Sequence, residues 1–554
     1  MSIVTAATWV PRGQAAQFPT KAVFDGEEYS RIAKLAKLQL DDAQAELEEA
    51  QEAEEVEEEV TGTEQANGAA KNAKSKKKSS DQKEDVDDDL KEYDLDNYDN
   101  DEEDEDGTKN VLGMFSNIKS LAYYESNDDD PYITLKDGED SDSEREELEI
   151  MDTDNLLLAA RIEDEVAHLE VYVYEDEADN LYVHHDIMLP AIPLTVEWLN
   201  YGVGREANEG GKANFVAVGT MDPEIEIWDL DVVDSMYPNA VLGQVSESAT
   251  EVDKSKKKKK KKKSKKPNEN HHVDAVLSLA ANRQHSQLLA SASADTTVKL
   301  WDLSTTQCAK SYSWHTDKVC SIAWNPKDTT GLLSGSYDRT VVLADMRAPD
   351  GEVRRWGVES DVESVRWNPH DPFFFYVSTE NGVIHYHDAR VAPTDISKTK
   401  PLWTLQAHDK AITTFDVNPI IPGFLVTGSA DKQTKLWNID PAAGPSMVVS
   451  RDLGVGQVFA TSFAPDQEVG FRLAVAGSKG DVKVWDTSTN KAVRSVFAGR
   501  VREGIFGKEG DAEVEERFVG VEESSDEDSS DGEEAGEEGQ DGWEDEDEDE
   551  EMEG

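Results

Sequence analysis

Apolar and polar positions follow one pattern that recurs along the middle of this chain. A short run of apolar and small residues is followed by a turn with an aspartate and then by alternating apolar and polar residues. The three clearest copies are Leu288 to Ser304 (LLASASADTTVKLWDLS), Leu332 to Arg347 (LLSGSYDRTVVLADMR) and Phe424 to Asp440 (FLVTGSADKQTKLWNID). Each copy predicts a β-hairpin, because period-two alternation next to a turn is typical of strands.

Looser copies of the same pattern raise the predicted number of repeats to seven. They are Leu156 to Glu175, Phe215 to Asp231, Phe375 to Arg390 and Leu473 to Ser488. From Trp301 onward the equivalent positions Ala344, His387, Trp437 and Trp485 follow at steps of 43, 43, 50 and 48 residues. This period is typical of WD repeats with four strands per blade. We therefore predict an all-β fold, a seven-bladed WD40 β-propeller.

A further apolar strand precedes most hairpins and ends before a proline. Examples are Val319 to Trp324 and Val362 to Trp367, each followed by Asn-Pro. Such strands are predicted to line the central channel, since proline ends a strand where no ladder donor is needed. For the first blade, residues 118–124 (IKSLAYY) are the predicted inner strand, with an acidic excursion at residues 136–147 interrupting the blade.

Histidines before three inner strands are each followed by a turn aspartate. The predicted network consists of His272 with Asp295, His315 with Asp338, and His408 with Asp431, joined by Ser291, Ser334 or Thr427 and by Trp301 and Trp437. A histidine, an aspartate and a serine could also indicate a hydrolase. Three copies at the repeat spacing favour a structural hydrogen-bond network instead.

Charge is distributed unevenly. The chain has 118 acidic and 56 basic residues, a net charge of −62, and runs such as Asp99 to Asp106 and Trp543 to Glu553 are almost entirely acidic. Such runs have little apolar surface to bury and are predicted to be disordered. The predicted organisation is an N-terminal anchor segment with a helix (1–60), an acidic linker (61–110), the propeller (111–500, with a lysine-rich insertion at 235–271) and an acidic tail (501–554).

The N-terminal segment combines aromatic residues with a helical pattern. Ile32, Ala36 and Leu40 fall at helical spacing after a possible capping box formed by Asp25 and Glu28. The favoured interpretation is a detached arm that binds a partner through Trp9, Pro11, Arg12, Phe18 and Pro19. The alternative is that this segment packs on the propeller.

A run of lysines follows the second hairpin. It comprises Lys256, Lys257, Lys258, Lys259, Lys260, Lys261, Lys262, Lys263, Lys265 and Lys266. Such a run cannot pack in a core and suits nuclear import receptors and phosphate backbones. Nuclear targeting and contact with rRNA are both predicted, and a merely solvated loop is the alternative.

Serines within acidic stretches are candidate phosphorylation sites. They are Ser141, Ser143, Ser524, Ser525, Ser529 and Ser530. Phosphate there would add charge to segments that are already charged, so unmodified acidic loops are equally compatible with the pattern.

Other chemistry is sparse in the sequence. Two cysteines, Cys308 and Cys320, are too few for a disulfide framework, which fits a reducing compartment. No apolar stretch approaches the roughly 20 residues of a membrane helix, and no glycine-rich phosphate loop is present. His184-His185 and His385-x-His387 lack a third metal ligand. We expect no catalysis, cofactor, metal, membrane contact or small-molecule substrate.

Segments outside the repeats resemble the eukaryotic periodic tryptophan protein 1 family. They include Thr8 to Gly13 (TWVPRG), Asp130 to Asp137 (DPYITLKD), Leu169 to Tyr174 (LEVYVY) and Val196 to Asn200 (VEWLN). The resemblance covers most of residues 1–500 and implies a nucleolar protein of large ribosomal subunit assembly and rRNA processing. For some members of the family, the resemblance also implies links to chromatin and rDNA transcription.

The resemblance implies a non-enzymatic scaffold that binds assembly proteins and pre-rRNA in the nucleolus. The alternative is a histone- or chromatin-binding protein, since acidic arms suit basic histone tails. A third and weaker reading rests on Asp345-Met346-Arg347 and Asp388-Ala389-Arg390, which are similar to the paired Asp-x-Arg boxes of ubiquitin-ligase substrate receptors.

Overall fold

The computed structural model describes residues 2–22, 148–164, 166–203, 212–244, 268–348, 351–501 and 516–521. These residues belong to two compact units. The larger unit is the propeller. In the smaller unit, β2 (Thr20–Lys21) pairs in parallel with β9 (Val232–Val233). The predicted helix after Tyr29, the acidic linker, the lysine run and the candidate phosphoserines lie outside the described residues.

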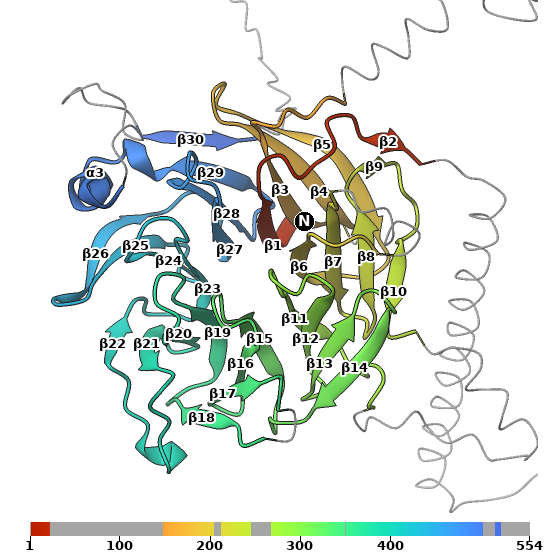
Figure 1. The fold of residues 1–554 in the computed structure, drawn as a ribbon. Helices are drawn as coiled ribbons and strands as arrows, with labels where there is room; N and C mark the ends of the chain where they lie inside the picture. Colours follow the sequence, from red (N-terminus) through yellow and green to blue (C-terminus); the bar gives the residue numbers. More distant parts are fainter. Residues whose placement is uncertain are drawn as a thin grey trace, which may run out of the picture. The chain divides into compact units, whose positions relative to one another are not determined.

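Seven four-stranded antiparallel sheets form the larger unit and surround a central axis (Figure 1). The first three blades are β1 (Ser2–Val10), β3 (Asn155–Glu163), β4 (Val166–Glu175), β5 (Asn180–Leu189); β6 (Pro193–Leu199), β7 (Phe215–Thr220), β8 (Ile225–Asp229), β10 (Ala240–Leu242); and β11 (Val276–Ala281), β12 (Leu288–Ser293), β13 (Val298–Asp302), β14 (Gln307–Tyr312). The all-β, seven-bladed prediction is confirmed.

The remaining four blades repeat the same order from the axis outward. They are β15 (Val319–Trp324), β16 (Gly331–Ser336), β17 (Thr340–Asp345), β18 (Arg354–Gly357); β19 (Val362–Trp367), β20 (Phe374–Thr379), β21 (Val383–Asp388), β22 (Trp403–Gln406); β23 (Ile412–Val417), β24 (Phe424–Ser429), β25 (Thr434–Asp440), β26 (Gly444–Arg451); and β27 (Val458–Phe463), β28 (Arg472–Gly477), β29 (Val482–Asp486), β30 (Arg517–Gly520). Every hairpin predicted from the repeats is present.

Within the described residues, short helices stand between strands of the fifth and seventh blades. They are η7 (Ile396–Lys398), and then η8 (Thr487–Thr489), α3 (Lys491–Phe497) and η9 (Ala498–Arg500) in succession. Helix α3 begins where the Asn490 side chain accepts hydrogen bonds from the backbone N–H groups of Ala492 and Val493. Its buried residues Val493 and Phe497 join the apolar core between the sixth and seventh blades.

The inner strand of the first blade is not the predicted one. Strand β1, from the very start of the chain, pairs with β3, so residues 2–10 take the place assigned to residues 118–124, which lie outside the described residues. The prediction that Trp9 belongs to a detached arm is therefore wrong, as is a propeller boundary at residue 111. Trp9 is 5% exposed and packs among residues of the first and seventh blades.

Strand β1 carries the same local irregularity as the other inner strands. A β-bulge follows Val4 in β1, and equivalent bulges follow Val319 in β15 and Val362 in β19. A tryptophan stands five residues after each of these valines: Trp9, Trp324 and Trp367. A bulge bends a strand and increases its twist, so a shared bulge gives each inner strand the same course along the channel.

The three tryptophans make the same bond to the preceding blade. Trp324 Nε1 donates to the Ala280 carbonyl at 3.0 Å, and Trp367 Nε1 donates to the Ala323 carbonyl at 3.1 Å. Trp9 Nε1 donates to the Ser462 carbonyl of the seventh blade at 3.0 Å. The first and last blades are thus joined by the interaction that joins consecutive blades elsewhere in the ring.

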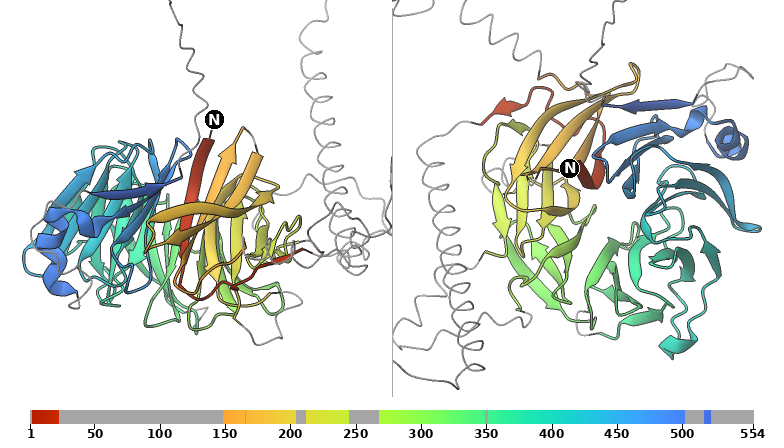
Figure 2. Two further views of the ribbon diagram at one scale, coloured as in Figure 1. Left: turned by 90° about the horizontal axis from the view of Figure 1, so that it is seen from above. Right: turned by 180° about the vertical axis from the view of Figure 1, so that it is seen from behind.

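The outermost strand of the seventh blade corrects the predicted tail. Residues Arg517–Gly520 form β30 and pair with β29, although residues 501–554 were all assigned to a disordered tail. Arg517 also forms an ion pair with Asp179 of the first blade at 2.8 Å. Figure 2 shows both ends of the described chain at the junction of these two blades. The hydrophobic pattern of so short a strand was too weak to distinguish it within an acidic stretch.

The predicted histidine networks are confirmed. His272 bonds Asp295 at 3.0 Å and Ser291 at 2.7 Å, and Trp301 donates to the same serine. Equivalent bonds join His315 with Asp338 and Ser334, and His408 with Asp431 and Thr427, which Trp437 also contacts. These groups are buried or nearly so and bonded to one another, which stiffens the hairpin of each blade.

Protonation in these networks follows from burial and hydrogen bonding. Burial alone would raise the pKa of the Asp295 carboxyl, but hydrogen bonds from His272 and Thr297 outweigh it and lower the pKa to about 2. Burial lowers the pKa of His272 despite the neighbouring aspartate. The network of His272 and Asp295 is therefore most stable with the aspartate ionised and the histidine neutral.

We predict that Trp9→Ala destabilises the propeller by about 3 to 5 kcal/mol, the usual cost of truncating a buried tryptophan. Urea denaturation of the full chain measures this. Met447→Ala is the control, because Met447 is 58% exposed and its loss should change stability by no more than about 0.5 kcal/mol. A loss below about 1 kcal/mol in Trp9→Ala would mean that β1 does not close the ring.

We predict that Asp338→Ala destabilises the fourth blade by roughly 1 to 3 kcal/mol, because His315 and the backbone N–H of Thr316 lose their acceptor. Denaturant midpoints compare this variant with Asp409→Ala, which removes an exposed aspartate from a loop on the same face. Equal midpoints for the two variants would contradict the network in this blade.

Candidate functional site

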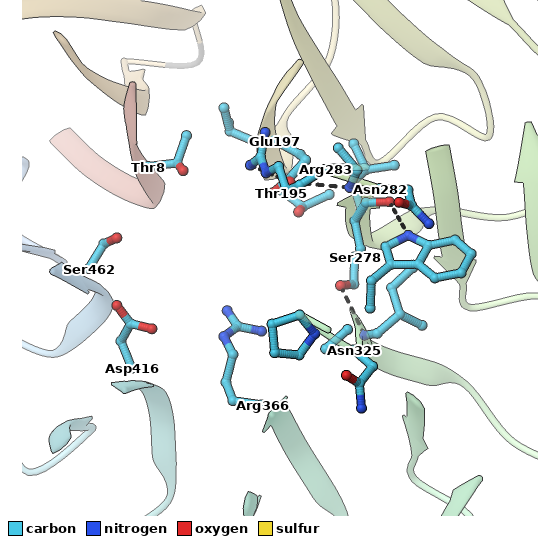
Figure 3. A pocket seen from close by; sticks show the side chains of 18 of the residues that line it. Thr8, Thr195, Glu197, Ser278, Asn282, Arg283, Asn325, Arg366, Asp416 and Ser462 are labelled. Atoms are coloured by element: carbon cyan, nitrogen blue, oxygen red, sulfur yellow. Dashed lines mark hydrogen bonds and ion pairs between the residues drawn. The ribbon is translucent and has the colours of Figure 1, made fainter. Parts of the chain in front are cut away.

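A polar cavity of about 420 Å³ lies among the inner strands, and its lining comes from all seven blades. Figure 3 shows the labelled side chains around it, with Thr8 and Ser462 on one side and Ser278 and Asn325 on the other. The Ser278 hydroxyl accepts from the backbone N–H of Ile322 at 3.3 Å. Hydroxyl groups on the inner strands thus link neighbouring blades as well as facing the cavity.

Charged side chains of both signs line the cavity. Arg283 donates to the Glu197 carboxylate and to the Trp198 carbonyl, each at 2.9 Å, and its guanidinium lies 5.0 Å from the centre of the Trp198 ring. Arg366 and Asp416 face the cavity from neighbouring blades (Figure 3). Burial raises the pKa of the Asp416 carboxyl, and the positive charge of Arg366 only partly offsets this. The sequence analysis did not identify these residues as cavity-lining. The signal that could have found them is the alternation of side chains along the inner strands.

The loops at the cavity's end of the ring are bonded from blade to blade. Asn282 donates to the Thr329 carbonyl at 2.7 Å, Asn325 to the Pro372 carbonyl at 2.8 Å, and Asn418 to the Gly470 carbonyl at 2.7 Å. The Nε2 atom of His370 is 2.9 Å from the Asn418 carbonyl oxygen. These bonds hold successive loops in one arrangement, so the face that they form is preorganised for binding.

The residues predicted to bind a partner through the N-terminal arm separate into two groups. Arg12 lies at the closure between the first and seventh blades, where its backbone N–H donates to Asp466 and its Nε donates to Asn155. Pro11 follows β1 directly and is half-buried. Trp9, Pro11 and Arg12 therefore serve the ring and not an arm. Phe18 and Pro19 belong to the smaller unit, where Pro19 is buried.

The lysine-rich insertion is anchored at its end. Lys256 to Lys263, with Lys265 and Lys266, lies outside the described residues, which resume at Asn268. The carbonyl of Asn268 accepts a hydrogen bond from the buried Lys299 side chain, whose Nζ also donates to Ser311 at 2.7 Å. The insertion therefore returns to the third blade at a defined point next to the histidine network of His272.

The histidine pairs noted in the sequence are packing residues. Burial, with a contribution from the neighbouring histidine, lowers the pKa of His185 to about 4 and that of His387 to about 3. His387 stacks on Phe375 with ring centres 5.3 Å apart, in the position that tryptophan occupies in other blades. Within the described part of the chain, no group of three or more His, Cys, Asp or Glu residues could hold a metal ion.

In each of the two Asp-x-Arg turns, the arginine pairs with the aspartate of the same turn. Arg347 and Arg390 each form an ion pair with the aspartate two residues earlier, Asp345 and Asp388, at 2.7 Å. Both arginines are more than half exposed. Arg390 also lies over the rings of Phe373 and Phe374.

Among the described residues, no helix is long and apolar enough to cross a membrane.

Comparisons with known proteins match the architecture. The family model described as "WD domain, G-beta repeat" matches residues 265–302, 306–345 and 399–438, which overlap the third, fourth and sixth blades. A WD repeat-containing protein of Schizosaccharomyces pombe is 48% identical over 528 residues, covering 95% of this chain and 97% of that protein.

Two further relatives share a name. "Periodic tryptophan protein 1" of Saccharomyces cerevisiae is 40% identical over 536 residues, covering 89% of this chain and 90% of that protein. "Periodic tryptophan protein 1 homolog" of Drosophila melanogaster is 30% identical over 502 residues, covering 90% of this chain and 96% of that protein. With these identities along nearly the whole length, the chain belongs to the periodic tryptophan protein 1 family of WD-repeat proteins.

Proposed function

We propose that this protein is a non-enzymatic scaffold in the assembly of the large ribosomal subunit and in rRNA processing, acting in the nucleolus. The observation that carries this proposal is family membership along nearly the whole chain, combined with a ring whose loops are fixed by bonds between blades. WD-repeat propellers of this kind typically serve as scaffolds. The surface formed by these fixed loops is suited to binding and not to catalysis.

The preorganised loops support a binding role. Asn282, Asn325 and Asn418 fix the loops on the face near the cavity, and the histidine networks fix the turns of three blades. A surface that is already ordered loses little conformational entropy on binding. Assembly proteins and structured pre-rRNA are the partners proposed for it. Histones are the alternative partner, because acidic segments attract basic tails.

The lysine run is proposed to act in nuclear targeting, and contact with pre-rRNA is compatible with that role. Lys256 to Lys263 supply a dense positive charge in a chain whose net charge is −62. Positive side chains gain affinity for phosphates by releasing bound counterions.

We predict that deleting residues 255–266 lowers nuclear accumulation but leaves the melting temperature nearly unchanged, since shortening a loop by half changes closure entropy by only about 0.6 kcal/mol. Fluorescence microscopy and thermal denaturation measure the two effects. A variant with glutamine at each lysine of the run keeps the loop length and should behave like the deletion. Normal nuclear levels in both variants would exclude a targeting role.

The assembly role is tested by affinity purification of the full chain at low and high salt, with and without ribonuclease. Large-subunit pre-ribosomal proteins and pre-rRNA should be recovered at both salt concentrations. Recovery should fall in Trp9→Ala, whose ring is predicted to be weakened, and should persist in Met447→Ala. Recovery of histones without pre-ribosomal proteins would support the chromatin alternative, and recovery of a cullin adaptor would support a ubiquitin-ligase receptor.

A further inference from the structure

One ring of side chains surrounds the central channel at the level of the cavity, and we call it the channel layer. Each inner strand contributes the fourth residue after the position at which its β-bulge begins, such as Val362 in β19 or Ile412 in β23. Because the inner strands share this bulge and the same place in their blades, the seven residues lie at one depth. They are Thr8, Glu197, Ala280, Ala323, Arg366, Asp416 and Ser462, and all of them line the cavity.

Two small members of the channel layer leave room in the channel. Ala280 and Ala323 come from the third and fourth blades, and their short side chains leave space beside Arg366 of the fifth blade. The cavity is reached from the face of the fixed loops, because the exposed loop residues Gln284 and Pro326 also line it. Its volume of about 420 Å³ is within the range of sites that hold small ligands.

The acidic member from the second blade has its charge compensated. The Glu197 carboxylate accepts from the backbone N–H of Ala281 in the next blade at 3.2 Å and from Arg283 at 2.9 Å. This pair is therefore close to neutral as seen from the cavity, and the remaining two charged members decide what the cavity attracts.

The remaining charged members face the cavity without pairing with each other. Within the described residues, Arg366 makes one hydrogen bond, from Nη1 to the carbonyl of the adjacent Val365 at 3.2 Å. Asp416 accepts from the backbone N–H of Phe463 at 2.9 Å, and no described cation forms an ion pair with it. Both side chains point into the cavity (Figure 3). The space between them thus has hydrogen-bond donors on one side and acceptors on the other.

We propose that this space binds a carboxamide side chain, glutamine or asparagine, of a partner polypeptide. The carboxamide oxygen would accept from the Arg366 guanidinium, and the amide NH₂ would donate to the Asp416 carboxylate. Arg366 is followed in β19 only by Trp367, so this part of the channel lies near the face of the fixed loops and within reach of a side chain that enters there.

The same two residues select against charged groups. A lysine or arginine side chain would be repelled by Arg366, and a carboxylate or phosphate would be repelled by Asp416. Specificity often depends on such repulsion as much as on attraction. A neutral group with a donor and an acceptor side by side satisfies both residues at once.

The inference concerns the face for which we propose a binding role, but it does not depend on ribosomal partners. It rests on the channel layer alone, and its test uses none of those partners. Failure of the test would therefore leave the proposed function intact.

The test uses the full chain and N-acetyl, N-methylamide derivatives of single amino acids as probes. The glutamine and asparagine derivatives carry the carboxamide, those of glutamate, aspartate and lysine are the charged counterparts, and that of leucine is the apolar one. Saturation-transfer NMR titrations at millimolar concentration measure binding at neutral pH. We expect a carboxamide derivative to bind about tenfold or more tightly than the others, as hydrogen bonds to charged groups imply.

Two variants should reverse the preference. Asp416→Asn keeps an oxygen that can accept from Phe463 but leaves the charge of Arg366 uncompensated, so the glutamate derivative should bind more tightly than the glutamine derivative. Arg366→Gln leaves Asp416 as the uncompensated charge and should favour the lysine derivative. Partial unfolding would weaken all probes alike, so a reversed order separates the charge effect from a loss of structure.

Matched controls make the same replacements outside the channel layer. Asp409→Asn and Arg347→Gln alter exposed residues and should preserve the order of the wild-type protein. Failure of both carboxamide derivatives to bind, or equal binding of all probes, would overturn the proposal. A wild-type preference for the glutamate derivative would also overturn it, because Asp416 would then be uncharged at neutral pH. So would an unchanged order in both channel variants.

Discussion

Closure of the ring between the first and seventh blades is the constraint on which the rest of the propeller depends. Each blade buries its two faces against its neighbours, so an open ring would expose the apolar faces of two blades at once. The closing strand β1 stands at the start of the chain and is followed by more than 130 residues before β3 begins. Bringing β1 and β3 together closes this long loop at a cost in chain entropy. That cost grows only slowly with loop length, so the buried contacts of Trp9 can offset it.

Polar contacts also stabilise this closure, next to the apolar cluster that Trp9 forms with residues of the first and seventh blades. Asp466 of the seventh blade accepts from the backbone N–H of Arg12 and from the Asn155 side chain. Arg472, also in the seventh blade, donates to Asp176 of the first blade at 2.7 Å. Buried or half-buried ionic groups of this kind are costly if left unpaired. They therefore favour a single register between the first and last blades over a slipped one.

The blades are not equally supported by the histidine network. The third and sixth blades have the full set of histidine, aspartate, hydroxyl and tryptophan, and the fourth keeps His315, Asp338 and Ser334 but has Ala344 at the tryptophan position. The fifth blade replaces this tryptophan by His387, which stacks on Phe375, and extends an aromatic cluster through Tyr376, Tyr386 and Trp403. Aromatic packing there stabilises the blade where the polar network is absent.

The sequence by itself determined the repeat, the hairpins and the histidine networks, because these depend on alternation and on residues at short, regular separations. Only the tertiary structure decided which segment completes the first blade. The segment Val4 to Pro11 has the same valine, tryptophan and proline spacing as Val319 to Pro326. This spacing does not assign the segment to the first blade, because its partner strand β3 lies far along the chain, and local pattern does not encode which distant strand a segment pairs with. The cavity lining and the channel layer likewise depend on side chains that come together only when the seven blades close.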